Sequence, residues 1–256
     1  MVTLYLEYKI IKNRPGLLGD LASILGLMQI NIKTVASIED IYRGFLLEFY
    51  SPESKKRLLD AFSAVEELKI TALRPPNLED LLALKHGKKV SLRLQEGIYV
   101  FPRHELEMLI DFMSNYLKQN HNVLIGIKGG PRSGKTETAI AAAVHANKQW
   151  RLLSTTLLRK TTVMELSEKE LDSDTVYIID AISSFHRAPA RHVRLMRDFV
   201  TYNYPRIIEH PEIAIQETTL QPEDFNIMIE LRRQKEDEDP KDSNLDQYIS
   251  NFTSFE

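Results

Sequence analysis

The sequence predicts an α/β protein with two domains, and three observations predict it. Strand-like and helix-like runs alternate over residues 2–73, and a glycine-rich turn joins an apolar run to a helix-forming run over residues 123–144. The pair Pro75-Pro76 separates these regions, and 256 residues suffice for two domains that each bury a core. We therefore expect domains at 1–74 and 90–234, a linker at 75–89 that contains one or two helical turns, and a flexible acidic tail at 235–256.

Composition restricts the classes of function. The net charge of −3 argues against nucleic acid as a partner, and the absence of cysteine excludes disulfides and thiolate-ligated metals. No apolar run approaches the roughly 20 residues that cross a bilayer, and the first residues lack the features of a secretion signal. We expect a cytoplasmic protein without a membrane partner.

The first domain shows six alternating elements. Runs rich in β-branched and aromatic residues predict strands, whereas leucines at helical spacing after Pro15 predict a helix that this proline can open. The expected elements are a strand at 2–11, a helix at 17–28, strands at 30–38 and 42–50, a helix at 53–65 and a strand at 68–73. This βαββαβ order is the split βαβ arrangement of ferredoxin-like folds.

The turn Asn13-Arg14-Pro15-Gly16-Leu17-Leu18, followed by Gln29-Ile30-Asn31-Ile32, resembles the opening of ACT domains, the small regulatory modules of amino-acid metabolism. In that family effectors bind near the first strand–helix turn, usually where two modules pair. The resemblance implies that a small-molecule effector such as an amino acid would lie nearest to Arg14, Gly16, Leu17 and Asn31. ACT domains often have Asp where this chain has Asn13, and many only dimerise, so an effector site and a homodimer surface both stay open.

The second domain is expected to hold a parallel sheet with helices. The predicted elements are a hairpin from 90–94 and 98–101, a helix at 104–120, a strand at 123–128, a helix at 136–147, and strands at 175–180, 212–220 and 225–233.

A glycine-rich turn between the strand and helix of 123–147 matches the pattern G-x-x-x-x-G-K-[ST] without a mismatch. Such a turn presents backbone N–H groups and a helix N-terminus to phosphate oxygens, and glycine keeps the concave surface open. The phosphate-binding residues predicted are Gly129, Gly130, Pro131, Arg132, Ser133, Gly134, Lys135 and Thr136. An accidental glycine-rich turn is the alternative, which the strand–turn–helix context disfavours.

The last two residues of the turn carry separate roles. Lys135 would reach the β- and γ-phosphates as a mobile charge, and the hydroxyl of Thr136 would ligate Mg²⁺. The expected cofactors are therefore Mg²⁺ and ATP or another nucleoside triphosphate. A GTPase-type Asn-Lys-x-Asp motif is absent, which favours ATP.

In the run Thr175–Asp180, four apolar residues are followed by an acidic one. This run is similar to the Walker B strand of P-loop NTPases. A carboxylate at the carboxyl edge of a parallel sheet lies beside the metal, so Asp180 is expected to hold Mg²⁺ through water. The following residue is Ala181, so no adjacent Glu orients an attacking water.

A row of arginines follows this strand. Arg191 and Arg194 would share one face of a helix, and Pro189 makes the same placement doubtful for Arg187. The row either closes over phosphates and stabilises transferred charge or forms a solvated basic face. With Lys135 and Asp180, Arg191 and Arg194 complete the expected catalytic set.

Three functions follow from these patterns. The first is a Mg²⁺-dependent NTPase or kinase-like phosphotransferase that the ACT-like domain regulates, and the second is a nucleotide sensor without useful turnover. The third, a nucleic-acid-associated regulator, depends only on the arginine row, and the net charge argues against it. An ACT-like module joined to a P-loop domain also resembles an uncharacterised family of Bacillus-type bacteria, which implies an architecture but no activity.

Overall fold

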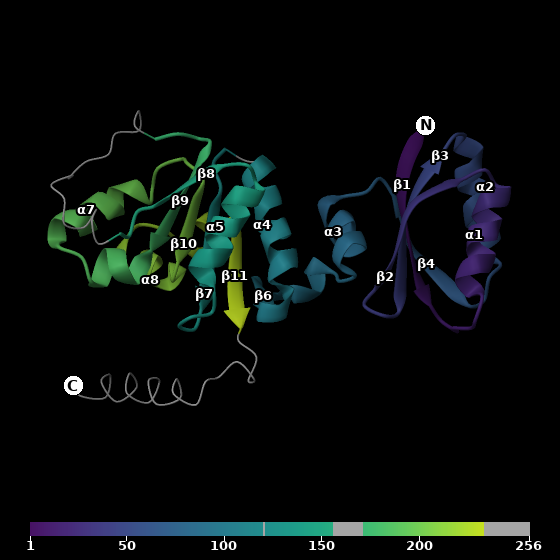
Figure 1. The fold of residues 1–256 in the computed structure, drawn as a ribbon, viewed down its shortest axis with the longest axis horizontal. Coiled ribbons are helices and arrows are strands. Elements are labelled where there is room, and N and C mark those ends of the chain that lie inside the picture. The colour runs from purple at the N-terminus through teal and green to yellow at the C-terminus, as the bar shows by residue number, and fades with distance from the viewer. Residues whose placement is uncertain (120, 156–170, 233–256) are drawn as a thin grey trace. The chain divides into compact units, whose positions relative to one another are not determined.

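The computed structural model describes residues 1–119, 121–155 and 171–232. The chain divides into two compact units, Met1–Leu92 and Arg93–Glu256. Each unit has its own sheet, of four strands in the first and seven in the second (Figure 1). The prediction of a mixed α/β protein is thus confirmed. The expected acidic tail at 235–256 lies outside the described residues.

The first unit has the predicted βαββαβ order. Its elements are β1 (Val2–Ile10), α1 (Leu17–Leu27), β2 (Asn31–Ile38), β3 (Tyr42–Phe49), α2 (Pro52–Ser63) and β4 (Leu68–Arg74). The strands form an antiparallel sheet in the order β2-β3-β1-β4. The backbone N–H of Glu53 donates to the side chain of Ser51, which thereby caps α2.

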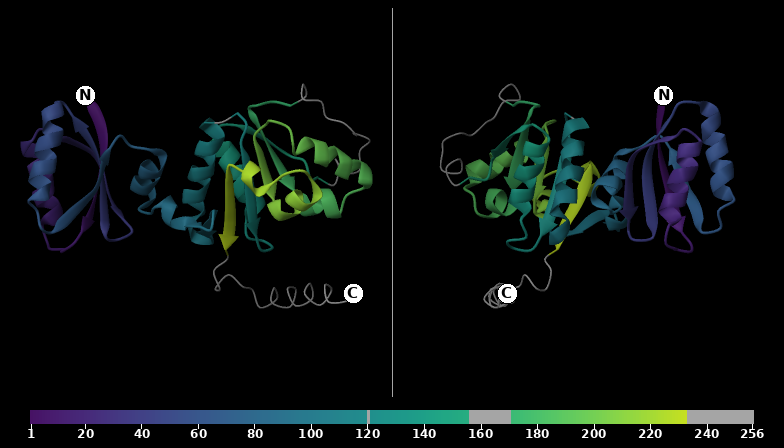
Figure 2. Two further views of the ribbon diagram at one scale, coloured as in Figure 1. Left: turned by 180° about the vertical axis from the view of Figure 1, so that it is seen from behind. Right: turned by 45° about the vertical axis from the view of Figure 1, so that its right-hand side comes forward.

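The sheet of the first unit is covered on both faces. Alternate residues of β1, including Leu6 and Tyr8, pack with α1 and α2, whereas Tyr5 points to the opposite face. There it meets Ala83 and Leu84 of a further helix, α3 (Leu78–His86), which Figure 2 shows on the other side of the sheet from α1 and α2.

Helix α3 corrects the expectation of a linker at 75–89. Arg74 at the end of β4 forms two bonds to the carboxylate of Asp80, at 2.6 and 2.9 Å. Asp80 and Asn77 also cap the start of the helix reciprocally, and Gly87 ends it with a φ of 68°. Because these local contacts and the apolar face both fix α3, the first compact unit extends past residue 74 to Leu92.

The second unit contains a mixed sheet of seven strands with helices on both faces. Its elements are β5 (Leu94–Gln95), β6 (Ile98–Pro102), α4 (Leu106–Gln119), β7 (Leu124–Gly129), α5 (Lys135–His145), β8 (Gln149–Leu152), β9 (Thr175–Asp180), α7 (Ala190–Phe199), β10 (Arg206–Glu209), α8 (Pro211–Glu217) and β11 (Ile227–Arg232). The strand order is β5-β6-β11-β7-β10-β9-β8, and every neighbouring pair is parallel except β5 with β6.

Two predictions for this unit need correction. Residues 212–220 were expected to be a strand but lie largely in α8, where Pro211 occupies the first turn and Ala214 is buried. Isoleucine at every second position, Ile213 and Ile215, is the spacing of a strand and led to that prediction. The hairpin is present only as the short pair β5 and β6, because residues 90–93 form a 3₁₀ turn.

The parallel arrangement brings three strand ends to one edge of the sheet. In the Cα register, Glu209 at the end of β10 pairs with Ile127 of β7 on one side and with Asp180 of β9 on the other. Strand β7 ends at Gly129, where the glycine-rich turn begins. Within the described residues, no helix is both long and apolar enough to cross a membrane.

Candidate functional site

The turn between β7 and α5 contains three residues with positive φ. Gly129, Arg132 and Gly134 have φ values of 155°, 56° and 92°. Gly134 is also the N-cap of α5 and provides no side-chain cap. The first amides of α5 therefore lack the usual side-chain acceptor, which is the arrangement that lets a helix N-terminus receive an anion.

The glycines of the turn are needed for different reasons. A Cβ at Gly129 would lie 2.7 Å from the carbonyl oxygen of Leu231 and 2.8 Å from the hydroxyl of Ser133. A Cβ at Gly130 or Gly134 would meet no atom within 4 Å, but Gly134 needs its positive φ. The close neighbours of a Cβ at Gly129 are thus β11 and Ser133 of the turn itself.

Ser133 provides an unsatisfied polar group inside the turn. Its side chain is 2 % exposed, and its hydroxyl has no hydrogen-bond partner among the described residues. A buried hydroxyl without a partner costs about 1–3 kcal/mol. A phosphate oxygen held by the turn would supply the missing acceptor.

The ammonium of Lys135 lies against the start of the turn. It donates to the carbonyl oxygens of Gly129 and Gly130, at 3.0 and 2.9 Å, and the residue is 7 % exposed. Lys135 therefore holds a buried positive charge at the place where the predicted phosphates would lie.

A carboxylate that the sequence had not indicated lies beside Thr136. The hydroxyl of Thr136 donates to Oε1 of Glu209 at 2.6 Å, and Glu209 is 5 % exposed. Burial raises the pKa of Glu209, the charge of Asp180 raises it further, and the bond from Thr136 and the charge of Lys135 lower it. The run Arg206–Glu209 repeats the apolar-then-acid pattern of Thr175–Asp180, but four residues were too few to identify a strand.

Asp180 is positioned by hydrogen bonds with two serines, one before it and one after it in the chain. Its Oδ2 accepts from the hydroxyl of Ser183 at 2.5 Å, and its backbone N–H donates to the hydroxyl of Ser154 at 2.6 Å. Asp180, Glu209 and Thr136 present only oxygen atoms, which suit Mg²⁺. No group of three or more His, Cys, Asp or Glu suited to a metal occurs in the described residues.

The two predicted arginines lie on α7. Arg191 and Arg194 are exposed, and α7 packs with α8 on one face of the sheet, whereas α5 covers the other (Figures 1 and 2). Arg187 precedes the helix, because Pro189 is its N-cap. A contact of Arg191 or Arg194 with phosphate stays a prediction.

The residues expected near an effector lie in the first unit. Arg14 forms ion pairs with Asp20 at 2.7 Å and Glu67 at 3.2 Å, and Gly16 is the N-cap of α1 with a φ of 85°.

The other two expected effector residues differ in exposure. Leu17 is buried in the core, whereas the exposed Asn31 begins β2 and donates to Glu48 of β3 at 2.9 Å. An effector carboxylate at Arg14 would therefore compete with two carboxylates of the protein itself, and effector binding there stays a prediction.

Comparison with known proteins places this sequence among proteins of unknown activity. Residues 70–255 match the family described as "Protein of unknown function (DUF3388)". The chain is also similar to the uncharacterized protein YmfK of Bacillus subtilis (strain 168), with 40 % identity over 229 residues that cover 89 % of this chain and 85 % of that protein. The family match begins within β4 and includes all of the second unit except its last residue.

Proposed function

This chain belongs to the DUF3388 family, and we propose that its second unit is a P-loop domain that binds Mg²⁺ with a nucleoside triphosphate at the turn Gly129–Thr136. ATP is preferred to GTP in this proposal. The main support for this proposal is that the turn lies beside two carboxylates at one edge of the sheet. The hydroxyl of Thr136 donates a hydrogen bond to Glu209, and Glu209 is in register with Asp180. That combination provides for both the polyanion and its cation.

Each group of the site has a distinct role in this proposal. The turn amides and the hydroxyl of Ser133 would hold phosphate oxygens. Lys135 would exchange the carbonyls of Gly129 and Gly130 for the β- and γ-phosphates, which neutralise its buried charge. Thr136 and Asp180 would hold Mg²⁺, whose charge offsets that of the phosphates.

Glu209 would provide the acid that is missing after Asp180. A buried carboxyl with a raised pKa accepts a proton more readily than an exposed one, so Glu209 can take the proton of an attacking water or acceptor hydroxyl. This role supports turnover as a Mg²⁺-dependent NTPase or a kinase-like phosphotransferase. Phosphoryl transfer depends mainly on positioning and charge neutralisation, which the turn and Lys135 would provide.

A nucleotide sensor without useful turnover is the second candidate. It is favoured by Ala181, which leaves no acid directly after Asp180. In either case, the first unit would act as an ACT-like regulatory module in a cytoplasmic homodimer, with an amino acid as its small-molecule effector. The βαββαβ order and the strand order β2-β3-β1-β4 support that assignment.

Titration of a fluorescent ATP analogue into the full chain, with and without Mg²⁺, tests nucleotide binding. The expected result is saturable binding that Mg²⁺ strengthens and that Lys135→Ala weakens by about 10- to 100-fold. Lys128→Ala is the matched control, because Lys128 lies near the end of β7, the strand that leads into the turn, but pairs with Glu230 at 3.4 Å. Equal loss in both variants, or no saturation at millimolar nucleotide, would refute the proposal.

Phosphate release over hours separates the enzyme from the sensor. If Glu209 accepts the proton, Glu209→Gln should keep nucleotide binding and lose phosphate release. Tight binding of nucleotide by the unmodified chain with no release or transfer of phosphate would favour the sensor instead.

A further inference from the structure

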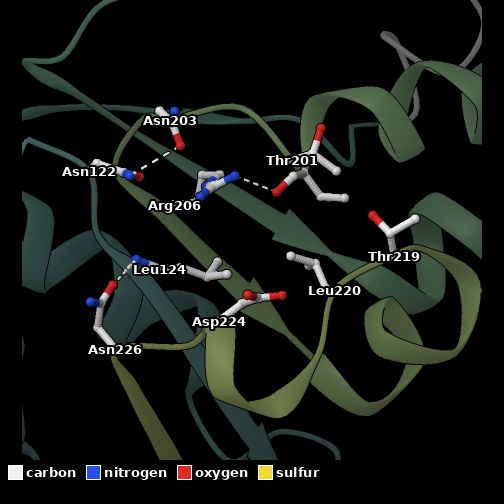
Figure 3. A pocket seen from close by; sticks show the side chains of 10 residues that line it. Asn122, Leu124, Thr201, Asn203, Arg206, Thr219, Leu220, Asp224 and Asn226 are labelled. Carbon is white, nitrogen blue, oxygen red and sulfur yellow. Dashed lines mark hydrogen bonds between the residues drawn. The ribbon is translucent and has the colours of Figure 1, made fainter.

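A second polar cavity lies at the opposite edge of the sheet from the phosphate turn. Its volume is about 320 Å³, and it opens where β7 and β10 begin (Figure 3). Amide, hydroxyl and charged side chains dominate its lining, which consists of Asn122, Leu124, Val200, Thr201, Asn203, Arg206, Thr219, Leu220, Asp224 and Asn226. None of these residues belongs to the site proposed for nucleotide.

Arg206 is the unusual residue of this cavity. It is 5 % exposed, and its Nη1 donates to the carbonyl oxygen of Val200, the C-cap of α7. Its Nε has no hydrogen-bond partner, and no ion pair to Arg206 occurs among the described residues. Burial lowers the pKa of Arg206 to about 10, although the charge of Asp224 opposes this, so the side chain stays protonated at neutral pH.

A buried guanidinium with an unsatisfied donor is costly unless an acceptor meets it. The bond to Val200 uses one of the five donors of the side chain, so capping α7 does not account for the whole group. A carboxylate matches the planar fork of arginine with two parallel hydrogen bonds. An anionic ligand would therefore satisfy Arg206 in a way that the described protein groups do not.

The rest of the lining restricts the kind of anion. Figure 3 shows Arg206 between Asn203 and Asp224, so a carboxylate of the protein lines the same space. The charge of Asp224 disfavours a doubly charged phosphate, whereas a single carboxylate is tolerated. Asn122 and Asn203 bond to each other at 3.2 Å and present amides that can meet hydroxyl or amino groups of a small molecule.

We propose that this cavity binds a small polar carboxylate through Arg206. The volume lies at the lower end of the range for small-molecule sites, which restricts the ligand to a compact metabolite. The strands β7 and β10 separate this site from the phosphate turn, since both begin at the cavity and end at the turn.

Ligand-observed NMR on the full chain, with L-lactate and L-glutamate as probes that carry a net charge of about −1 at neutral pH, tests the proposal. At least one probe is expected to bind saturably with a Kd below about 1 mM, and Arg206→Met should weaken it at least tenfold. Lys135→Ala should leave this binding unchanged, because Lys135 lies at the other edge of the sheet. Loss of nucleotide binding in Lys135→Ala would therefore not affect the outcome here.

A second variant blocks the cavity without removing the hydrogen bond by which Arg206 caps α7. Thr219 is exposed and lines the cavity, so Thr219→Trp should block it while leaving Arg206 in place. Gln216→Trp adds the same bulk at an exposed position outside the lining and should have no effect. If Arg206→Met does not fold, probe binding by Thr219→Trp alone tests the proposal. The proposal is overturned if no probe saturates, or if the folded cavity variants bind as well as the unmodified chain.

Discussion

The chain contains two turns that are similar in backbone but different in surroundings. In each unit a strand leads into a helix whose N-cap is a glycine with positive φ, Gly16 at 85° and Gly134 at 92°, and neither helix has a side-chain cap. At the first turn, Arg14 is exposed and paired with two carboxylates. At the second, Lys135 is buried against backbone carbonyls.

A glycine-capped helix start is therefore not by itself evidence of a phosphate site. An anion approaching Arg14 would have to displace Asp20 and Glu67 from an exposed ion pair. An anion approaching Lys135 would meet a buried positive charge that donates to two backbone carbonyls, together with the unsatisfied hydroxyl of Ser133.

Removal of the two cations should have very different effects on nucleotide affinity. A charge-assisted hydrogen bond contributes about 1.5–3 kcal/mol, so Lys135→Ala should weaken ATP binding by about 10- to 100-fold. Arg14→Ala should leave the affinity unchanged. Calorimetric titration measures both, and equal effects would show that the contrast between the turns has no functional meaning.

Alanine substitutions should distinguish Gly129 from Gly130. A Cβ at Gly129 would lie 2.7 Å from the carbonyl of Leu231, so Gly129→Ala is expected to lower the free energy of unfolding by about 2–3 kcal/mol. Gly130→Ala has open space and should change it by less than about 0.5 kcal/mol. Urea denaturation measures this pair, and a tolerated Gly129→Ala would contradict the packing of the turn on β11.

The pH dependence of stability should reveal the buried state of Glu209. Because burial raises the pKa of Glu209 above its ordinary value of 4.5, the folded chain binds this proton more tightly than the unfolded chain. The stability that results is present below the ordinary pKa and is lost as pH rises through the raised one. Glu209→Gln cannot ionise, so its unfolding free energy relative to the unmodified chain should increase from pH 4 to pH 8.

The exposed Glu137, which follows Thr136 in sequence, is the control for this measurement. Glu137→Gln should not reproduce the trend. Parallel pH profiles for Glu209→Gln and the unmodified chain would mean that the carboxyl of Glu209 is as well solvated in the folded state as in the unfolded one.

The smallest effect is expected for the ion pairs of Arg14. Exposed salt bridges contribute about 0–1 kcal/mol, so Arg14→Ala should lower the free energy of unfolding by less than about 1 kcal/mol. Urea denaturation at low and high salt measures this. A larger, salt-independent loss would indicate that Arg14 organises the first turn.

Local patterns predicted much of the fold, but tertiary contacts decided the rest. The strands of the first unit and the helix α5 followed from residue type and spacing, because their apolar faces repeat over many residues. β8 and β10 have only four residues each, and β10 is held by strands on both sides. A run of four residues is too short to show a hydrophobic period, so the sequence did not indicate β10 or the position of Glu209.

The packing of α3 shows the same limit. Its sequence follows Pro75-Pro76 and suggests a linker, but its apolar residues match a sheet face that the strands alone leave uncovered. The turn Gly129–Thr136, in contrast, is predicted from sequence as a phosphate site because a fixed spacing defines the motif. Their surroundings, such as the carbonyl of Leu231 next to Gly129, required the assembled sheet.

A crystal structure of the full chain grown with a non-hydrolysable ATP analogue and Mn²⁺ tests the central claim most directly, because Mn²⁺ replaces Mg²⁺ and scatters anomalously. The account predicts phosphate density within the turn Gly129–Thr136 and an anomalous peak at the hydroxyl of Thr136, on the side of Asp180 and Glu209. Nucleotide bound elsewhere, with Lys135 still against the carbonyls of Gly129 and Gly130, would contradict it.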